Sequence, residues 1–181
     1  MIMLNKNQER VSIFIDGSNL YHSLKALKGI KIDFEKLVKE ISKDKILTNA
    51  FYYIAPLDIT SDEEKYWKHQ KFLSELEKIP KFKVVLCTLR KHKHDDGTFG
   101  FDVKGDDVYL ANDMLVGAYE NLYDTAVLVS GDEDFMPIIN TLKRLKKKTE
   151  NAFFMSTSSK KLRKLCDKSI NLITILNKIK R

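Results

Sequence analysis

The chain has few of the residues that build disulfide-rich, membrane-spanning or linker-containing proteins. It contains two cysteines, three prolines and seven glycines among 181 residues. Cys87 and Cys166 both lie in apolar runs, which predicts buried thiols rather than a disulfide framework. No apolar run is long enough to span a membrane, and residues 1–10 lack the basic and then apolar pattern of a signal peptide. We therefore expect a cytoplasmic protein with no membrane partner, folded as a single domain over residues 1–181.

Several motifs of well-known chemistry are also missing. The sequence has no His and Cys constellation for zinc, no glycine-rich Walker loop and no Gly-x-Ser-x-Gly motif. The turn Asp16-Gly17-Ser18 supplies one carboxylate where an aspartyl-phosphate enzyme would need an Asp-x-Asp pair. The sequence therefore disfavours zinc enzymes, P-loop NTPases, hydrolases with a serine nucleophile elbow and this class of phosphatase.

Positive charge is present but unevenly distributed. The formal net charge is +7. The segment from Lys143 to the end has 13 Lys and Arg against two acids, a net charge of +11, whereas the preceding part has 19 basic and 23 acidic residues, a net charge of −4. A basic flank beside an acidic centre suits a polyanionic substrate. Lysine-rich, solvated helix faces are the simpler explanation of any single lysine in that segment.

Two short apolar stretches are each followed by a carboxylate. Residues 126–129 are Ala-Val-Leu-Val, and after Ser130 and Gly131 come Asp132, Glu133 and Asp134. Residues 11–15 are Val-Ser-Ile-Phe-Ile, followed by Asp16. Open α/β sheets carry their chemistry at the carboxyl ends of their strands, so parallel neighbours would bring these acids into one crevice.

Two interpretations of these acids are open. Adjacent carboxylates repel one another, so a cluster predicts a bound cation, and hard oxygen ligands suit Mg²⁺ or Mn²⁺. Alternatively, acids at helix N-termini complement the helix dipole. Two independent strand ends with aspartate favour the metal interpretation.

The order of elements predicts an α/β fold with a mostly parallel central sheet. We expect strands at residues 11–15, 50–54, 83–87, 126–130 and 151–155, with helices between them on both faces. The helix after residue 105 is expected to bury Val108, Ala111, Leu115, Ala118 and Leu122. A basic helix is expected over residues 160–168, followed at 172–176 by an edge strand or a short helix.

Residues 90–101 combine a run of basic residues and histidines with a turn signal, unlike the helices and strands expected elsewhere. Asp96-Gly97 is a turn signal, so this segment is expected to form a hairpin. A solvated basic hairpin is the default interpretation, and contact with a phosphate backbone is the second. His92 and His94 would face one side of a strand, which leaves metal ligation as a third.

Three ordered blocks resemble a known family. They are Phe14-Ile15-Asp16-Gly17-Ser18-Asn19-Leu20, Lys104-Gly105-Asp106-Asp107-Val108 with Ala111 and Asp113, and Ser130-Gly131-Asp132-Glu133-Asp134-Phe135-Met136-Pro137. These blocks resemble the NYN domain and, more narrowly, its LabA-like branch. Residues 162–170 are similar to that branch's closing helix. The resemblance implies a three-layer α/β/α PIN-like (Rossmann-like) fold and divalent-metal-dependent cleavage of RNA.

The resemblance also implies roles for particular residues. Its acidic set corresponds to Asp16, Asp107, Asp132 and Asp134, as catalytic residues that hold Mg²⁺ or Mn²⁺. Further candidates for the site are Asn19, Asp106, Asp113 and Ser130. Asp106 departs from the family pattern, which usually has an apolar or small residue there. Asp106 and Asp107 are therefore both candidates for the acid that opens the middle helix.

The expected partner is RNA, with single-stranded DNA as a second candidate and a homodimer as a further option. Candidate nucleic-acid-binding residues are Arg90, Lys91, Lys93, Lys104, Lys143, Arg144, Lys147, Lys160 and Lys161. The leading hypothesis is a metal-dependent ribonuclease. The alternative is a non-catalytic RNA-binding or regulatory module of the same fold.

Overall fold

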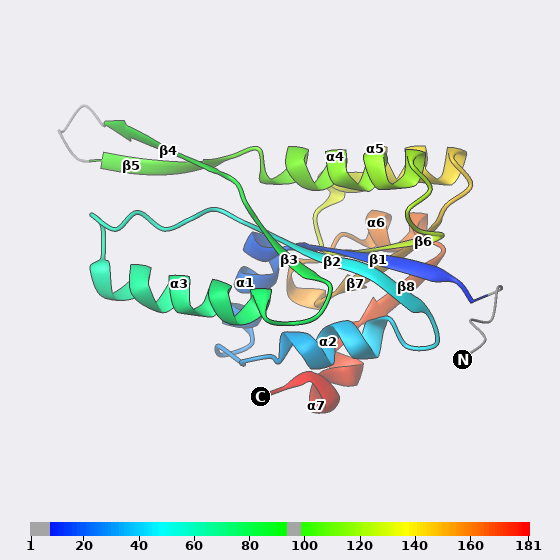
Figure 1. Cartoon of the computed structure of the whole chain (residues 1–181), viewed down its shortest axis with the longest axis horizontal. Coiled ribbons are helices and arrows are strands. Elements are labelled where there is room, and N and C mark those ends of the chain that lie inside the picture. Colours follow the sequence, from blue (N-terminus) through cyan, green and yellow to red (C-terminus); the bar gives the residue numbers. More distant parts are fainter. Residues whose placement is uncertain (1–7, 94–98) are drawn as a thin grey trace.

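The computed structural model describes residues 8–93 and 99–181, and its centre is a six-stranded parallel sheet (Figure 1). The strands lie in the order β3-β2-β1-β6-β7-β8. They are β1 (Arg10–Asp16), β2 (Ile46–Ile54), β3 (Phe82–Leu86), β6 (Thr125–Val129), β7 (Lys148–Phe153) and β8 (Lys168–Asn171). Every neighbouring pair is parallel. The predicted α/β class and mostly parallel sheet are confirmed.

Helices cover both faces of this sheet, which gives three layers. One face carries α1 (Gly17–Ala26), α2 (Phe34–Ile41), α3 (Glu63–Glu77) and α7 (Leu176–Ile179), and the other carries α4 (Asp106–Tyr119), α5 (Met136–Arg144) and α6 (Lys160–Leu165) (Figure 1). Side chains of β1 alternate between the two cores, with Ile13 and Ile15 in the first and Phe14 in the second. The central strands are therefore apolar on both faces, as their sequences predict.

A separate antiparallel hairpin lies between β3 and α4. Strands β4 (Thr88–Lys93) and β5 (Phe99–Lys104) pair with each other and project from the body of the molecule (Figure 1). The predicted hairpin is therefore present, although its Asp96-Gly97 turn and His94 lie outside the described residues. Its second strand leads directly into the first turn of α4.

The inner face of α4 was predicted only in part: Ala118 is buried and Ala111 and Leu115 pack partly buried against the same core, but Val108 and Leu122 do not. Val108 is 70% exposed and Leu122 is 48% exposed, whereas Leu110, Met114, Gly117 and Ala118 are the buried residues. The helix has apolar residues on two faces, and the sequence pattern alone does not distinguish them. Gly117 decides the packing, since a Cβ there would stand 2.8 Å from the Tyr123 ring.

The basic helix and the family's closing helix were also predicted to be too long. Helix α6 ends at Leu165, and Cys166 has an extended backbone. The Asp167 carboxylate accepts hydrogen bonds from the amide (2.8 Å) and the hydroxyl (2.9 Å) of Thr149, which turns the chain alongside β7. Residues 168–171 then add the sixth strand, and η3 (Leu172–Ile175) is a short 3₁₀ helix rather than a strand.

Two further expectations can be compared with the structure. Cys87 and Cys166 are both free and buried. The described part of the chain contains no helix that is long and apolar enough to cross a membrane.

Candidate functional site

Asp16 lies at the carboxyl end of β1, next to the carboxyl end of β6. Ile15 pairs with Val129, so Asp16 and Ser130 follow neighbouring residues of adjacent parallel strands. The Ser130 hydroxyl donates to Asp16 Oδ2 at 2.9 Å. Asp16 Oδ1 accepts from the backbone N–H of Asn19 at 2.9 Å and so caps α1. The aspartate is buried, and both of its oxygens have a partner within the protein.

The turn after β6 is fixed by hydrogen bonds from several segments. The Ser130 hydroxyl oxygen accepts from the Asp132 amide at 3.1 Å, and Asn19 Oδ1 accepts from the Gly131 amide at 3.0 Å. The Asn151 side chain, on β7, donates to the Ser130 carbonyl at 2.8 Å. A Cβ at Gly131 would lie 2.0 Å from the carbonyl oxygen of Thr157, so no larger residue fits this turn.

The three acids of this turn, Asp132, Glu133 and Asp134, have different surroundings. Asp132 Oδ1 accepts from the Asp134 amide at 2.9 Å and caps the short 3₁₀ helix Glu133–Phe135, whose Phe135 is buried. Asp134 is exposed. Glu133 accepts a hydrogen bond from the Ser159 hydroxyl at 3.0 Å. The turn therefore directs Glu133 toward the start of α6.

The N-terminus of α4 brings two more carboxylates to the same region. Gly105 has a φ of 83°, a left-handed conformation that glycine adopts at no steric cost and that lets β5 turn directly into α4. Asp106 and Asp107 occupy the first helical turn, where the helix dipole favours negative charge.

The pKa values of Asp16 and Asp107 reflect this convergence. Burial raises the pKa of Asp16, hydrogen bonds from Asn19 and Ser130 oppose the rise, and the charges of Asp106 and Asp132 add to it. Asp107 lies at the surface, but the surrounding protein shields its carboxylate from part of the water. This desolvation is the largest cause that raises its pKa, to about 6, followed by the charges of Asp106, Asp16, Asp132 and Asp134. Acids from three separate segments thus act on one another.

Asp113 does not join this group. It accepts a hydrogen bond at 2.9 Å from the hydroxyl of Tyr53, a residue whose side chain is buried under α4. This contact links α4 to β2, so Asp113 has a structural role.

The clustered carboxylates fit a divalent cation only if the ion keeps most of its water ligands. Among residues 8–93 and 99–181, no group of three or more His, Cys, Asp or Glu side chains stands close enough to hold a metal ion together. Mg²⁺ commonly keeps several waters and binds through one or two carboxylates. The mutually repelling carboxylates therefore fit a hydrated ion with few direct protein ligands, not a closed carboxylate cage.

The sequence matches the NYN domain over residues 10–174, which includes β1, β6, α4 and every acid described above. The chain belongs to the NYN domain family. This membership places its fold among those of PIN-like nucleases. No curated protein matches the chain.

A solved structure has the same fold as this NYN domain protein. It is the crystal structure of a protein of unknown function from Vibrio parahaemolyticus, with a TM-score of 0.74 and 23% sequence identity. The match covers 94% of this chain and 96% of that chain. The likeness extends over nearly the whole molecule and concerns the fold.

The candidate nucleic-acid-binding residues fall into two groups. Lys160 and Lys161 begin α6, and Lys161 lies 3.6 Å from Glu133 in the acidic turn. Arg90 is exposed on β4 of the hairpin that leads to α4, whereas the side chains of Lys91, Lys93 and Lys104 lie outside the described ones.

The second group is at the other end of α5. Lys143 forms an ion pair with Asp167 at 3.0 Å. Arg144 donates a hydrogen bond to Thr141, and Lys147 donates hydrogen bonds to the Asn121 side chain and to the Tyr123 carbonyl. Helix α5 has nine residues, so these side chains stand about 13 Å further along than the acidic turn.

The sequence prediction missed a polar network beneath the site. The Thr157 hydroxyl donates to Asn19 Oδ1 at 3.3 Å and shares a short hydrogen bond with Ser23. Asn151 is fully buried under the same turn. Thr157 lies in a Ser and Thr run that resembles an ordinary helix cap. Asn151 lies on β7 beside Lys148, Thr149 and Glu150, so nothing in this polar stretch of sequence marked it as a buried amide.

Proposed function

We propose that this NYN domain protein is a divalent-metal-dependent ribonuclease of the LabA-like branch. It hydrolyses RNA phosphodiester bonds at Asp16, Asp107, Asp132 and Asp134. One observation carries the proposal: carboxylates from the end of β1, the turn after β6 and the start of α4 act on one another, and the pKa of Asp107 rises to about 6. Acids that only cap helix N-termini act separately and would not need to lie near one another. Adjacent carboxylates repel one another, and a cation bound among them offsets that repulsion.

Each element of the site has its own part in this function. Asp107, Asp132 and Asp134 present carboxylate oxygens at or near the surface, where Mg²⁺ or Mn²⁺ would supply positive charge that stabilises the phosphodiester transition state. Buried Asp16 holds Ser130 and the start of α1 in place and adds negative charge from below. Asn19 fixes the turn that carries Asp132.

RNA would approach across the carboxyl ends of the strands. Lys160 and Lys161 lie beside the acidic turn, and Arg90 lies on the hairpin next to α4. Phosphate contacts from such residues position a strand without reading its sequence. Asp106 and Ser130 support the site from its rim and its floor.

A second candidate function is a non-catalytic RNA-binding module. The observation that favours it is that both oxygens of Asp16 already have protein partners, and the described residues form no ready group of three ligands. In that case the acids would serve as caps and RNA would bind through the basic residues alone.

Cleavage assays with matched substrates distinguish these functions. The protein is incubated with labelled RNA, single-stranded DNA or a small phosphate ester, each with Mn²⁺, with Mg²⁺ or with chelator. The ribonuclease proposal expects metal-dependent cleavage of RNA that Asp132→Asn reduces by at least about 100-fold, as is common when one essential group is removed. Asp44→Asn is the control, since Asp44 is exposed and has positive φ, which asparagine adopts readily.

The other outcomes each have a meaning. Tight RNA binding without turnover under any metal condition would support the binding module. Turnover of the small ester alone would indicate a phosphatase. Equal cleavage by the parent and Asp132→Asn proteins would contradict the assigned site.

A further inference from the structure

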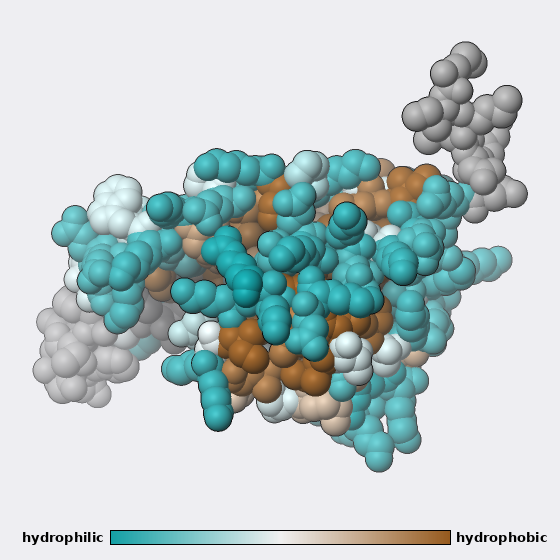
Figure 2. Space-filling model, turned by 90° about the horizontal axis from the view of Figure 1, so that it is seen from below, coloured by the Kyte–Doolittle hydropathy of each residue, from teal (hydrophilic) through white to brown (hydrophobic). Residues whose placement is uncertain are grey.

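A cavity lies on the opposite side of the sheet from α4 and α5. Apolar side chains gather in the middle of the face seen in Figure 2, surrounded by hydrophilic ones. This is the side of the sheet that carries α2, α3 and α7 in Figure 1. A cavity of about 460 Å³ opens between α1, the segment 29–32, the start of α2, β2 and α3. Its volume is within the usual range of sites for small organic ligands.

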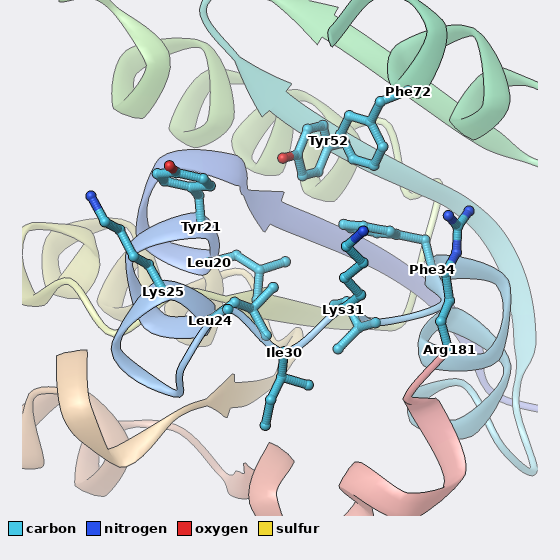
Figure 3. A pocket seen from close by; sticks show the side chains of 12 residues that line it. Leu20, Tyr21, Leu24, Lys25, Ile30, Lys31, Phe34, Tyr52, Phe72 and Arg181 are labelled. Carbon is cyan, nitrogen blue, oxygen red and sulfur yellow. The ribbon is translucent and has the colours of Figure 1, made fainter. Parts of the chain in front are cut away.

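The walls of this cavity are apolar and partly aromatic (Figure 3). Phe34, Tyr52 and Phe72 form one wall, with ring centroids 5.4, 5.6 and 6.0 Å apart in edge-to-face or tilted arrangements. Leu20 and Leu24 of α1 form another. An apolar ligand body would remove this surface from water, which is the main favourable term in such binding.

Positive charge surrounds the apolar walls. Three of the lining residues are cationic, namely Lys25, Lys31 and Arg181, and none is acidic. Arg181 lies 3.4 Å from Glu75. Within the described part of the chain, Lys25 and Lys31 have no ion pair or side-chain hydrogen bond, so their ammonium groups are available to an anion. The cavity therefore offers apolar area together with positive charge.

The same lining disfavours a nucleobase. Recognition of a base requires several hydrogen-bond donors and acceptors, and the neutral polar side chains at the cavity are two tyrosines, Tyr21 and Tyr52. The Tyr52 ring packs against Gly17, where a Cβ would stand 2.7 Å from Cζ. The aromatic wall thus lies directly beneath the residue that follows Asp16, but its chemistry differs from that of the acidic site.

We propose that this cavity binds an amphipathic organic anion, a single acidic group on an apolar body, with Lys31 at the acidic group and Lys25, which lies on the opposite side of the cavity in Figure 3, adding positive charge at the other end of the opening. The apolar body lies between Leu20 and Leu24 on one side and the three aromatic rings on the other. Lysine suits this position because its long apolar stem packs on the wall while its ammonium group remains in water beside the anion.

The test compares three probes that share one alkyl chain: decanoate, decanol and decyltrimethylammonium. Decanoate and decyltrimethylammonium are titrated calorimetrically into the full chain below their micelle concentrations, and decanol below its solubility limit. Decanoate should bind most tightly and the cation most weakly. Lys25→Ala/Lys31→Ala should lower the affinity for decanoate about two- to fivefold, as expected for one solvent-exposed charge contact, and leave that for decanol unchanged. The control Lys39→Ala/Lys71→Ala removes two exposed lysines that do not line the cavity and should change neither affinity.

A variant that fills the cavity completes the test. Leu24→Trp should abolish the binding of both decanoate and decanol, and Ile30→Trp, on the segment before α2, serves the same purpose if the first variant does not fold. Equal affinity for all three probes, equal effects of the two lysine pairs, or no binding would overturn the proposal. Displacement of decanoate by an RNA oligonucleotide would also overturn it and assign the cavity to nucleic acid.

Discussion

Asp132 is both a charge in the acidic site and the acceptor that caps the following 3₁₀ turn. Asparagine keeps the Oδ1 acceptor and removes the charge, whereas alanine removes both. We therefore predict that, in chelator, Asp132→Asn is as stable as the parent or slightly more stable, because a like charge leaves the cluster. Asp132→Ala should lose about 0.5–2 kcal/mol with the cap. Thermal melts of the three proteins measure this difference.

The same melts report on the metal. Mn²⁺ should raise the melting temperature of the parent, because a ligand that binds only the native state stabilises it. Asp132→Asn should reduce that rise, and Asp44→Asn should not. If Asp132→Asn is destabilised in chelator while RNA cleavage persists, the carboxylate is structural and the nuclease proposal fails.

Gly131 provides a prediction about steric fit. Alanine at this position would place its Cβ 2.0 Å from the Thr157 carbonyl oxygen, so the turn or the segment 155–158 must move. We expect Gly131→Ala to cost about 1–3 kcal/mol or more, as overpacking does, and to abolish RNA cleavage. Gly29→Ala is the comparison, since Gly29 has a φ of 71° and open space around it. It should cost only about 1–2 kcal/mol, the penalty of a left-handed backbone. Denaturant unfolding that ranks the two variants the other way would contradict this account.

At the level of single residues, the sequence located the acids but not the direction of their side chains. The positions of Asp16 and Asp132 at strand ends could be predicted from the apolar runs before them, and that of Asp107 at the start of a helix from the family resemblance; their shared role stays a prediction. The orientation of Glu133 toward Ser159, and of Asp113 toward Tyr53, depends on partners that are distant in the chain. Strand and helix patterns contain no information about such contacts.

At the level of elements, the predictions failed where a local pattern had two solutions. Helix α4 has two apolar faces, and only the contact of Gly117 with Tyr123 selects the buried one. Residues 160–168 resemble one long basic helix, yet Asp167 binds Thr149 and changes the segment's path. The central strands were predictable because their apolar runs allow one arrangement, burial on both faces.

Asp167 gives a pH-dependent prediction for the last strand. Burial of its carboxylate would raise its pKa, but hydrogen bonds from Lys143 and Thr149 outweigh that effect, and the pKa is lowered. A lowered folded-state pKa contributes stability that is present above the unfolded value, near 3.9, and is lost as the pH falls through the folded value. Asp167→Asn should therefore be about 1 kcal/mol less stable than the parent at pH 7, and the difference should shrink below about pH 4. Urea unfolding across this range measures it; a difference that does not change with pH would show that the charge is unimportant.

At the level of the whole molecule, net charge does not predict which basic residues meet RNA. The basic segment from Lys143 onward passes from the far end of α5 to the start of α6, so its charges are distributed over both ends of the parallel strands. Lys143 and Lys147 bind protein groups at the far end of α5, whereas Lys160 and Lys161 lie beside the acidic turn, where Lys161 pairs with Glu133 at 3.6 Å. The fold thus divides a segment that the sequence presents as one basic region.

This division predicts different salt dependences for two variants of equal charge. Lys160→Ala/Lys161→Ala and Arg144→Ala/Lys146→Ala each remove two positive charges, and Lys146 is exposed at the far end of α5. Binding of single-stranded RNA to a cleavage-deficient parent such as Asp132→Asn should weaken as salt increases, with a slope that falls by about 0.7 for each phosphate that the protein no longer neutralises. The Lys160/Lys161 pair should therefore reduce the slope by about 1.4, and the Arg144/Lys146 pair should leave it nearly unchanged. The slope is obtained from fluorescence anisotropy titrations over a range of KCl concentrations. Equal reductions in both variants would mean that RNA responds to the overall charge of the protein, and an unchanged slope in both would leave these lysines as ordinary solvated side chains.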